Sequence, residues 1–197
     1  LGEFKKRGMA GIGIEPSNVS GDYVKYRTFW NTTVATVVVN MHWSADIITA
    51  TNVFAHVDNL GEFLDAVSIA LAPDGLFIFE VPDLAELLRR CQFDTIYHEH
   101  LNYFSCASIL ALVATRNDLF LNSIEKVDIH GGSLLVTLSK KDNQIPLPSV
   151  ANDFWYIKEN IYNFDVDFGD GPVDYCLSSF RYGVVTAANQ DKKTTYW

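Results

Sequence analysis

The sequence predicts an α/β fold whose sheet is mainly parallel and ends in an antiparallel hairpin. Between residues 46 and 90, short apolar segments alternate with segments of helical periodicity, and this alternation is typical of parallel sheets covered by helices. Farther along, two strand-like segments, 120–129 and 133–139, are separated only by His130-Gly131-Gly132. A glycine-rich connection this short indicates an antiparallel hairpin.

The N-terminal elements are a helix and a short buried strand. Residues 1–7 resemble the last turns of a helix, and Gly8 follows them as a helix stop. The apolar run 11–14 leads to Glu15, and Pro16 prevents the strand from continuing. We therefore expect a buried parallel strand with a carboxylate at its carboxyl end.

The middle of the chain predicts two further strands, each followed by a helix. Residues 46–50 form an apolar strand, and residues 60–71 have the apolar spacing of an amphipathic helix. Pro73-Asp74-Gly75 predicts a turn, and residues 76–81 predict the next strand. Residues 83–90 predict a helix whose basic last turn suits the helix dipole.

A helix over residues 105–116, with Ser105 as its N-cap, precedes the hairpin. After residue 146 the pattern weakens. A helix is expected over residues 152–163, and residues 165–174 hold four aspartates and no basic residue, which indicates a solvated loop. We therefore expect one partial domain over residues 1–145, and a poorly defined C-terminal region that begins at residue 146.

Composition excludes several classes of protein. The formal net charge of −9 argues against a general nucleic-acid binder. The sequence contains no run of 18 apolar residues, so no membrane span is predicted. It also contains no basic segment followed by an apolar one, so no signal peptide is predicted. The cysteines, Cys91, Cys106 and Cys176, form no C-x-x-C pair. They indicate reduced thiols in a cytoplasmic protein rather than a disulfide framework or a cysteine zinc site.

Residues 93–105 are the strongest candidate for chemistry. His98, Glu99 and His100 are consecutive, and the phenols of Tyr97 and Tyr103 flank them. A neutral imidazole can take a proton at cellular pH, a carboxylate can orient it, and a phenol can stabilise an oxyanion. The alternative is a surface loop with two solvated histidines.

Several segments together resemble one family, the S-adenosylmethionine-dependent sugar C-methyltransferases, which act on nucleotide-linked 4-keto-deoxysugars. The matching segments occur in the family's order and are residues 13–17, 50–60, 71–75, 79–82, 93–105 and 129–134. The resemblance implies a Rossmann-like class I methyltransferase sheet, S-adenosylmethionine as the cofactor, a nucleotide-sugar substrate and a role in deoxysugar biosynthesis.

By this resemblance, three residues bind the cofactor. Glu15 accepts the ribose hydroxyls, Asn52 faces the methionine end, and Phe29 stacks near the adenine. Each has a structural alternative: a strand-end carboxylate in water for Glu15, a local turn for Asn52, and a core aromatic for Phe29. His56 is expected either to form a polar wall of the cleft or to point into solvent.

The resemblance also implies a mechanism. His100 removes the proton next to the ketone, Glu99 positions or polarises the site, and Tyr97 donates to the enolate oxygen. The carbon then attacks the sulfonium methyl group in line, without a metal. His98 is given no catalytic role.

Substrate binding is expected at His130, Gly131 and Tyr103. The glycines at 131 and 132 allow unusual backbone angles and close approach to a ligand. The alternative is a hairpin turn that needs glycine for its own geometry.

The sequence departs from the family in three places. Nothing before Gly11 supplies the first strand and its glycine-rich loop, and the cysteine-rich zinc module and the second α/β region are absent too. We therefore expect a fragment of a longer protein or a decayed copy. Residues 32–41 form a β-branched run where the family has a helix.

Two other functions remain open at this point. One is a non-catalytic remnant that serves as an interaction module. The other is a metal-dependent hydrolase that uses His98, His100 and His130. The oligomeric state is left open.

Overall fold

The computed structural model describes residues 2–18, 24–141 and 184–186. The predicted helix over residues 152–163, the acidic loop after it and the boundary at residue 146 lie outside these residues. The chain divides into two compact units, the first made of residues 1–44 and 61–70, the second of residues 45–60 and 71–197.

The first unit contains three helices and a two-stranded parallel sheet in its described part. The helices are α1 (Gly2–Lys6), α2 (Thr32–Met41) and α3 (Leu60–Ala70). The strands are β1 (Gly13–Ile14) and β2 (Val24–Tyr26). The predictions of α1 and α3 are confirmed, and β1 is shorter than the strand predicted over residues 11–14. Strand β2 was not predicted.

The β-branched run is a helix, so the expected departure in residues 32–41 is wrong. The side chain of Asn31 caps α2 by accepting a hydrogen bond from the backbone N–H of Val34 at 2.9 Å. This bond satisfies one of the donors that a helix start leaves unpaired. β-branched residues cost a helix only a few tenths of a kcal/mol each, so a capped helix with buried Ala35 and Val38 tolerates them.

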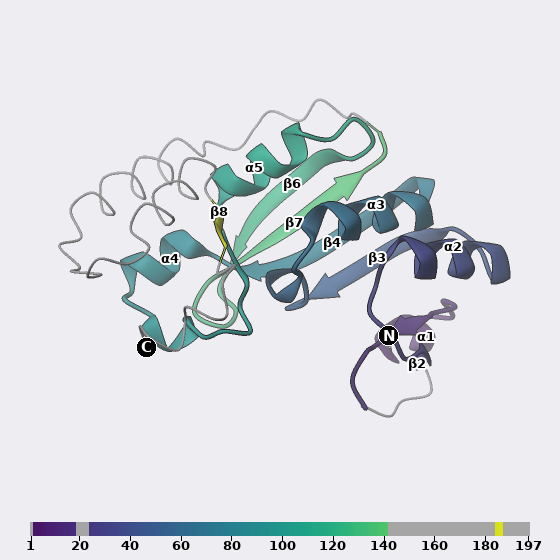
Figure 1. Ribbon diagram of the computed structural model, residues 1–197, viewed down its shortest axis with the longest axis horizontal. Helices are drawn as coiled ribbons and strands as arrows, with labels where there is room; N and C mark the ends of the chain where they lie inside the picture. The colour runs from purple at the N-terminus through teal and green to yellow at the C-terminus, as the bar shows by residue number, and fades with distance from the viewer. Residues whose placement is uncertain (1, 19–23, 142–183, 187–197) are drawn as a thin grey trace. The chain divides into compact units, whose positions relative to one another are not determined.

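The second unit is built on a four-stranded mixed sheet. Its strands are β3 (Ala45–Thr51), β4 (Leu71–Pro82), β6 (Phe120–Val127) and β7 (Ser133–Ser139). They lie in the order β3-β4-β7-β6 (Figure 1). The pair β3–β4 is parallel, whereas β7 is antiparallel to both β4 and β6. This is the predicted Rossmann-like arrangement, in which a parallel pair is completed by an antiparallel hairpin, but the described sheet is mixed rather than mainly parallel.

The hairpin is inserted so that its second strand, β7, lies beside β4. Phe79 pairs with Val136, and Val81 pairs with Leu134. Helix α5 (Cys106–Ala114) precedes the hairpin and packs against β6 (Figure 1). Ser105 caps α5 in a reciprocal pair of bonds with Ser108, which confirms the predicted cap.

The turn predicted at Pro73-Asp74-Gly75 is instead a bulge inside β4. Ala45 pairs with Leu71 and Ile47 pairs with Leu76, so the extra residues of β4 bulge between these two pairs. A Cβ atom at Gly75 would lie 2.8 Å from the carbonyl oxygen of Ala45. The glycine therefore permits the close approach of the two strands.

Shorter elements follow the strand ends. They are the 3₁₀ turns η1 (Phe54–His56) and η2 (Phe93–Thr95), helix α4 (Leu84–Arg89), and strands β5 (Asn102–Phe104) and β8 (Val184–Thr186). Asp83 caps α4, and the helix predicted over residues 83–90 is confirmed. β5 and β8 pair antiparallel. Within the described ranges, β3 has β4 as its strand partner and β1 has β2.

Aromatic side chains form the centre of the second unit. The ring of Phe54 lies 4.7 Å from Phe79, 6.3 Å from Phe77 and 5.4 Å from Phe104, centroid to centroid. All four side chains are fully buried. Phe54 therefore joins the loop after β3 to both β4 and β5.

We expect Phe54→Ala to lower the free energy of unfolding by about 3–5 kcal/mol, because it leaves a cavity among three other rings. Phe29→Ala serves as the matched control. Phe29 is 75% exposed, so its truncation should change stability by no more than about 0.5 kcal/mol. Denaturant unfolding measures both. Equal effects of the two substitutions would contradict the central role of Phe54.

Candidate active site

The candidate site lies in the second unit, beyond the carboxyl ends of β3 and β4. The chain leaves β3 through η1, which carries His56 at its end. The segment 97–100 leads into β5, and β5 packs against η1. As a result, the rings of His56 and His100 lie 4.8 Å apart, centroid to centroid.

Hydrogen bonds fix the tautomer of His100. Its Nδ1 lies 2.9 Å from the carbonyl oxygen of Thr95. A carbonyl only accepts, so Nδ1 carries the proton and donates it. In the neutral ring Nε2 is then an acceptor, and the Tyr97 hydroxyl, 2.8 Å away, donates to it. Tyr97 and His100 thus form a hydrogen-bonded pair with a defined direction.

His100 is held in the neutral state. The side chain is buried, with 7% of its surface exposed. Burial lowers the pKa of His100, and the neighbouring His56 lowers it further, while the Thr95 carbonyl and the Glu99 carboxylate oppose these effects. An imidazole of this kind is ready to accept a proton at neutral pH.

Tyr97 and Tyr103 have different surroundings. The side chain of Tyr97 is 41% exposed, and its ring lies against His100 with centroids 4.1 Å apart. Tyr103 is buried behind His100, edge-on to it, with its hydroxyl 3.4 Å from the Thr95 carbonyl oxygen. Burial raises the pKa of Tyr103 to about 12, so it remains a neutral donor. Its binding of substrate stays a prediction.

His56 belongs to the cluster although the sequence left its role open. Its Nδ1 lies 2.6 Å from the carbonyl oxygen of Glu99 and therefore carries the proton. The side chain is exposed, as expected if His56 points into solvent, but its ring also contacts His100. One signal for this was present in the sequence: both histidines belong to segments that follow strands of one sheet, and the carboxyl ends of parallel strands meet at one edge.

Glu99 contributes to this cluster through its backbone. Its carbonyl oxygen orients His56, whereas its side chain is exposed. The carboxylate favours the protonated form of His100 by charge. His98 is exposed and lies on the turn between Tyr97 and His100.

The turn at residues 130–132 packs against Glu86 in α4 and against Gln92, which follows that helix. Gln92 donates from Nε2 to the carbonyl oxygen of Gly131 at 2.9 Å. A Cβ atom at Gly131 would lie 2.7 Å from that Nε2, and one at Gly132 would lie 2.9 Å from the side chain of Glu86. Both glycines have positive φ angles. This packing supplies a structural reason for the glycines, and contact of His130 or Gly131 with substrate stays a prediction.

The predicted cofactor residues lie in both units. Asn52 directly follows β3, with a φ of +52° and an exposed side chain, and its backbone N–H donates to the carbonyl oxygen of Glu80 at 3.2 Å. Glu15 follows β1 in the first unit. The backbone N–H of Ser17 donates to its carboxylate at 2.9 Å, which lowers the pKa of Glu15. Phe29 is exposed, so the alternative of a core aromatic is wrong.

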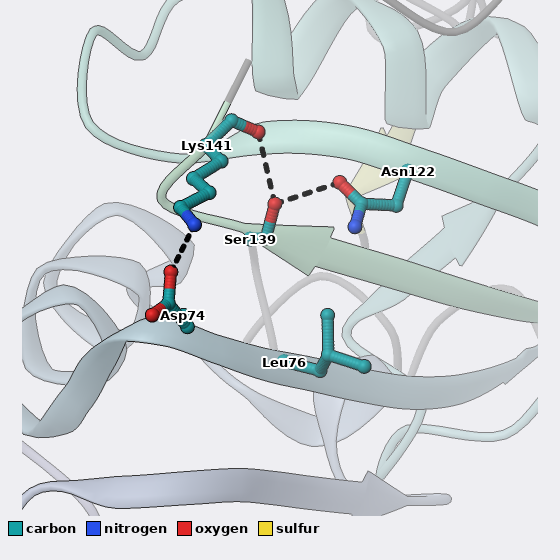
Figure 2. Close-up of a pocket in the computed structure, with 5 residues that line it drawn as sticks. All are labelled: Asp74, Leu76, Asn122, Ser139 and Lys141. Atoms are coloured by element: carbon teal, nitrogen blue, oxygen red, sulfur yellow. Dashed lines mark hydrogen bonds and ion pairs between the residues drawn. The ribbon is translucent and has the colours of Figure 1, made fainter. Parts of the chain in front are cut away.

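A shallow hollow lies at the other end of β4 (Figure 2). Lys141 forms an ion pair with Asp74, and the Ser139 hydroxyl lies 2.8 Å from Asn122 Oδ1 and 2.9 Å from the Lys141 carbonyl oxygen. The polar side chains that line it thus bind one another. It is remote from the histidines, and we assign no chemistry to it.

In the described residues, no three His, Cys, Asp or Glu side chains come together as metal ligands. None of the helices in the described ranges has the length and apolar character to cross a membrane.

Comparison with known proteins gives three findings. The profile of a family described as methyltransferase domain matches residues 1–117. The C-methyltransferase NovU of Streptomyces niveus is 35% identical over 139 residues, which cover 68% of this chain and 33% of NovU. This chain therefore spans about a third of the length of that relative. The crystal structure of the PH0226 protein from Pyrococcus horikoshii OT3 aligns with a TM-score of 0.47 and 17% identity, over 71% of this chain and 75% of that one.

We expect an NMR titration to place the pKa of His100 below its ordinary value of 6.5, because burial disfavours the charged ring. The folded chain then binds fewer protons than the unfolded chain below pH 6.5. The contribution of His100 to stability is therefore complete above pH 6.5 and is lost as the pH falls through the folded pKa. His56→Gln removes the neighbouring imidazole, which disfavours a proton on His100, and should therefore raise the pKa of His100. A wild-type pKa at or above 6.5 would contradict this.

We expect Gly131→Ala to destabilise the chain more than Gly8→Ala. Both glycines have positive φ angles, +85° and +78°, so both substitutions carry the backbone cost of about 1–2 kcal/mol. At Gly8 an added Cβ meets nothing within 4 Å, whereas at Gly131 it displaces the Gln92 amide. The lost hydrogen bond is half-buried and should add about 0.5–1.5 kcal/mol. Denaturant unfolding compares the two variants, and equal costs would show that the Gln92 contact is unimportant.

Proposed function

We propose that this chain, which belongs to the family of methyltransferase domains, carries the acid–base residues of a C-methyltransferase. S-adenosylmethionine is the cofactor that this membership implies. The proposed substrate is a nucleotide-linked keto-deoxysugar, methylated at the carbon next to its ketone. The similarity to a C-methyltransferase over 139 residues supports transfer to carbon, and the motifs of residues 93–105 and 129–134 support the sugar.

One observation carries the proposal: a buried, neutral His100 has its Nδ1 fixed by a backbone carbonyl and its Nε2 paired with the Tyr97 hydroxyl. Methylation of carbon next to a ketone requires removal of a proton from that carbon. A general base for this step needs a pKa near or below the working pH and a fixed orientation. His100 has both.

Tyr97 has two roles in the proposed mechanism. In the structure its hydroxyl donates to Nε2 of His100. When the ketone binds, the hydroxyl turns to the ketone oxygen, and the Nε2 lone pair becomes available. His100 then takes the proton from the adjacent carbon, and the electron pair moves onto the ketone oxygen. The Tyr97 hydroxyl stabilises the enolate that forms there.

His56 and Glu99 tune the base. A charge on His56 disfavours a proton on His100, and the Glu99 carboxylate favours it. The exposed ring of His56 also places a second polar group beside His100. With Nδ1 bound to Glu99, the neutral ring presents Nε2 as an acceptor.

The chemistry of three residues fits the cofactor. When bound, S-adenosylmethionine supplies a methyl group on a positively charged sulfur. Glu15 keeps a charged carboxylate that can accept the ribose hydroxyls. The exposed ring of Phe29 offers a face for the adenine, and the exposed amide of Asn52 suits the amino-acid end.

The experiment that tests the base is deuterium exchange at the substrate carbon. A nucleotide-linked 4-keto-deoxysugar is incubated with the chain in D₂O without cofactor, and mass spectrometry follows the uptake of deuterium. His100→Asn should slow the catalysed exchange by about 10²–10⁴-fold, because it removes the general base. His98→Asn changes a neighbouring exposed histidine and should leave the rate unchanged. Equal exchange with Asn at position 100 would exclude His100 as the base.

Calorimetry with S-adenosylmethionine is the companion measurement. Heat of binding that is reduced in Glu15→Gln would support the cofactor assignment. A folded chain that gives no heat would contradict activity of this chain on its own, and would favour the interaction module.

A further inference from the structure

Two side-chain hydrogen bonds connect the segments that carry the site histidines. His56 donates from Nδ1 to the carbonyl oxygen of Glu99 at 2.6 Å. In the other direction, Asn102 donates from Nδ2 to the carbonyl oxygen of Val57 at 2.7 Å. Val57 directly follows His56, and Asn102 lies two residues after His100. The second bond therefore holds the chain beside one histidine to the chain beside the other.

Asn102 is well placed to act as an anchor. Its side chain is only 3% exposed, and its backbone pairs with Thr186 in the β5–β8 ladder. The amide must present its NH₂ group to Val57, because a carbonyl accepts and does not donate. A buried amide on a paired strand has little freedom, so it can fix the position of its partner.

The segment that Asn102 holds is one short turn, in which the backbone N–H of His56 donates to the carbonyl oxygen of Val53 at 2.9 Å. The turn η1 spans only Phe54–His56, and no side chain caps its start. Phe54 and Ala55 are buried, which fixes the first part of the turn. The backbone N–H of Val57 reaches Phe54 only at 3.4 Å, which is longer than most backbone hydrogen bonds. The exposed His56 ring is thus positioned by its own bond to the Glu99 carbonyl and, through the backbone, by the Asn102 bond to the Val57 carbonyl.

We propose that Asn102 is a positioning residue that keeps the imidazole of His56 against His100 by holding the Val57 carbonyl. Its catalytic consequence rests on the proposed function, because only then does the pair of histidines face a substrate. The structural consequence, which is the position of the His56 ring, does not rest on the proposed function and can be measured without substrate.

Asn102→Asp tests the proposal by removing the donor with little change of shape. Asn102→Leu is the second variant, since leucine cannot donate in any protonation state. Asn122→Asp is the matched control, because Asn122 is a half-buried amide beside the hollow of Figure 2 and its Oδ1 acts as an acceptor that aspartate retains. ¹⁵N NMR of the imidazoles then distinguishes the Nδ1–H from the Nε2–H form of each ring.

The expected result is selective. In both Asn102 variants the Nδ1–H signature of His56 should be lost, and the pKa of His100 should rise as His56 moves away. His100 should keep its own Nδ1–H form, because the Thr95 carbonyl remains. His42 in the first unit reports on general loosening and should not change. An unaltered His56 signal in the folded Asn102 variants would overturn the proposal.

A measurement on the unsubstituted chain covers the case in which both variants fail to fold. The side-chain amide protons of Asn102 should exchange with solvent at least tenfold more slowly than those of Asn122, since Asn102 is buried and bonded. Equal exchange would overturn the proposal.

The catalytic readout separates this inference from the proposed function. If the wild-type chain methylates the sugar, Asn102→Asp should lower kcat roughly 10- to 100-fold by misplacing His56, with KM for S-adenosylmethionine unchanged. Combined with His56→Ala, it should lower kcat no further than the larger single effect. An additive loss would overturn the role through His56. If the wild-type chain is inactive, the proposed function fails, and the NMR result still decides the role of Asn102.

Discussion

The packing of Phe54 is the constraint on which the site depends. Its ring contacts Phe79 on β4 and Phe104 on β5, so it joins elements that are distant in sequence. Phe54 begins the turn that ends at His56, and Phe104 ends the strand that follows His100. The burial of apolar surface thereby places two polar side chains together. The order of the cluster is thus a product of the core beneath it.

A second set of contacts runs from the hairpin to the imidazole of His100. The side chain of Gln92 binds Gly131. The backbone carbonyl oxygen of Gln92 accepts a hydrogen bond from the Thr95 hydroxyl at 2.8 Å. The Thr95 carbonyl in turn orients His100. Position 92 therefore connects the β6–β7 turn to the base, and this explains how two motifs that lie far apart in the sequence belong to one structure.

The sequence predicted the elements that depend on local pattern. The strand at residues 46–50, the helix at 60–71 and the hairpin were all expected, because periodicity and glycine spacing mark them directly. Helix α2 was missed because the β-branched run was weighed without its Asn31 cap. Three-residue strands such as β2 and β5 have no period to detect. The contact between His56 and His100 depends on tertiary packing, and so do the bonds of Gln92 and Asn102.

The orientation of His100 comes from a peptide carbonyl rather than from a carboxylate side chain. Every amino acid at position 95 supplies that oxygen, so a substitution there keeps the acceptor for His100, although it removes the bond of the Thr95 hydroxyl to Gln92. An insertion or deletion between residues 95 and 100 would instead move the oxygen out of reach. To keep His100 oriented, homologous sequences must therefore keep the number of residues in this segment and the path of its backbone. A family comparison limited to side-chain identity would overlook this requirement.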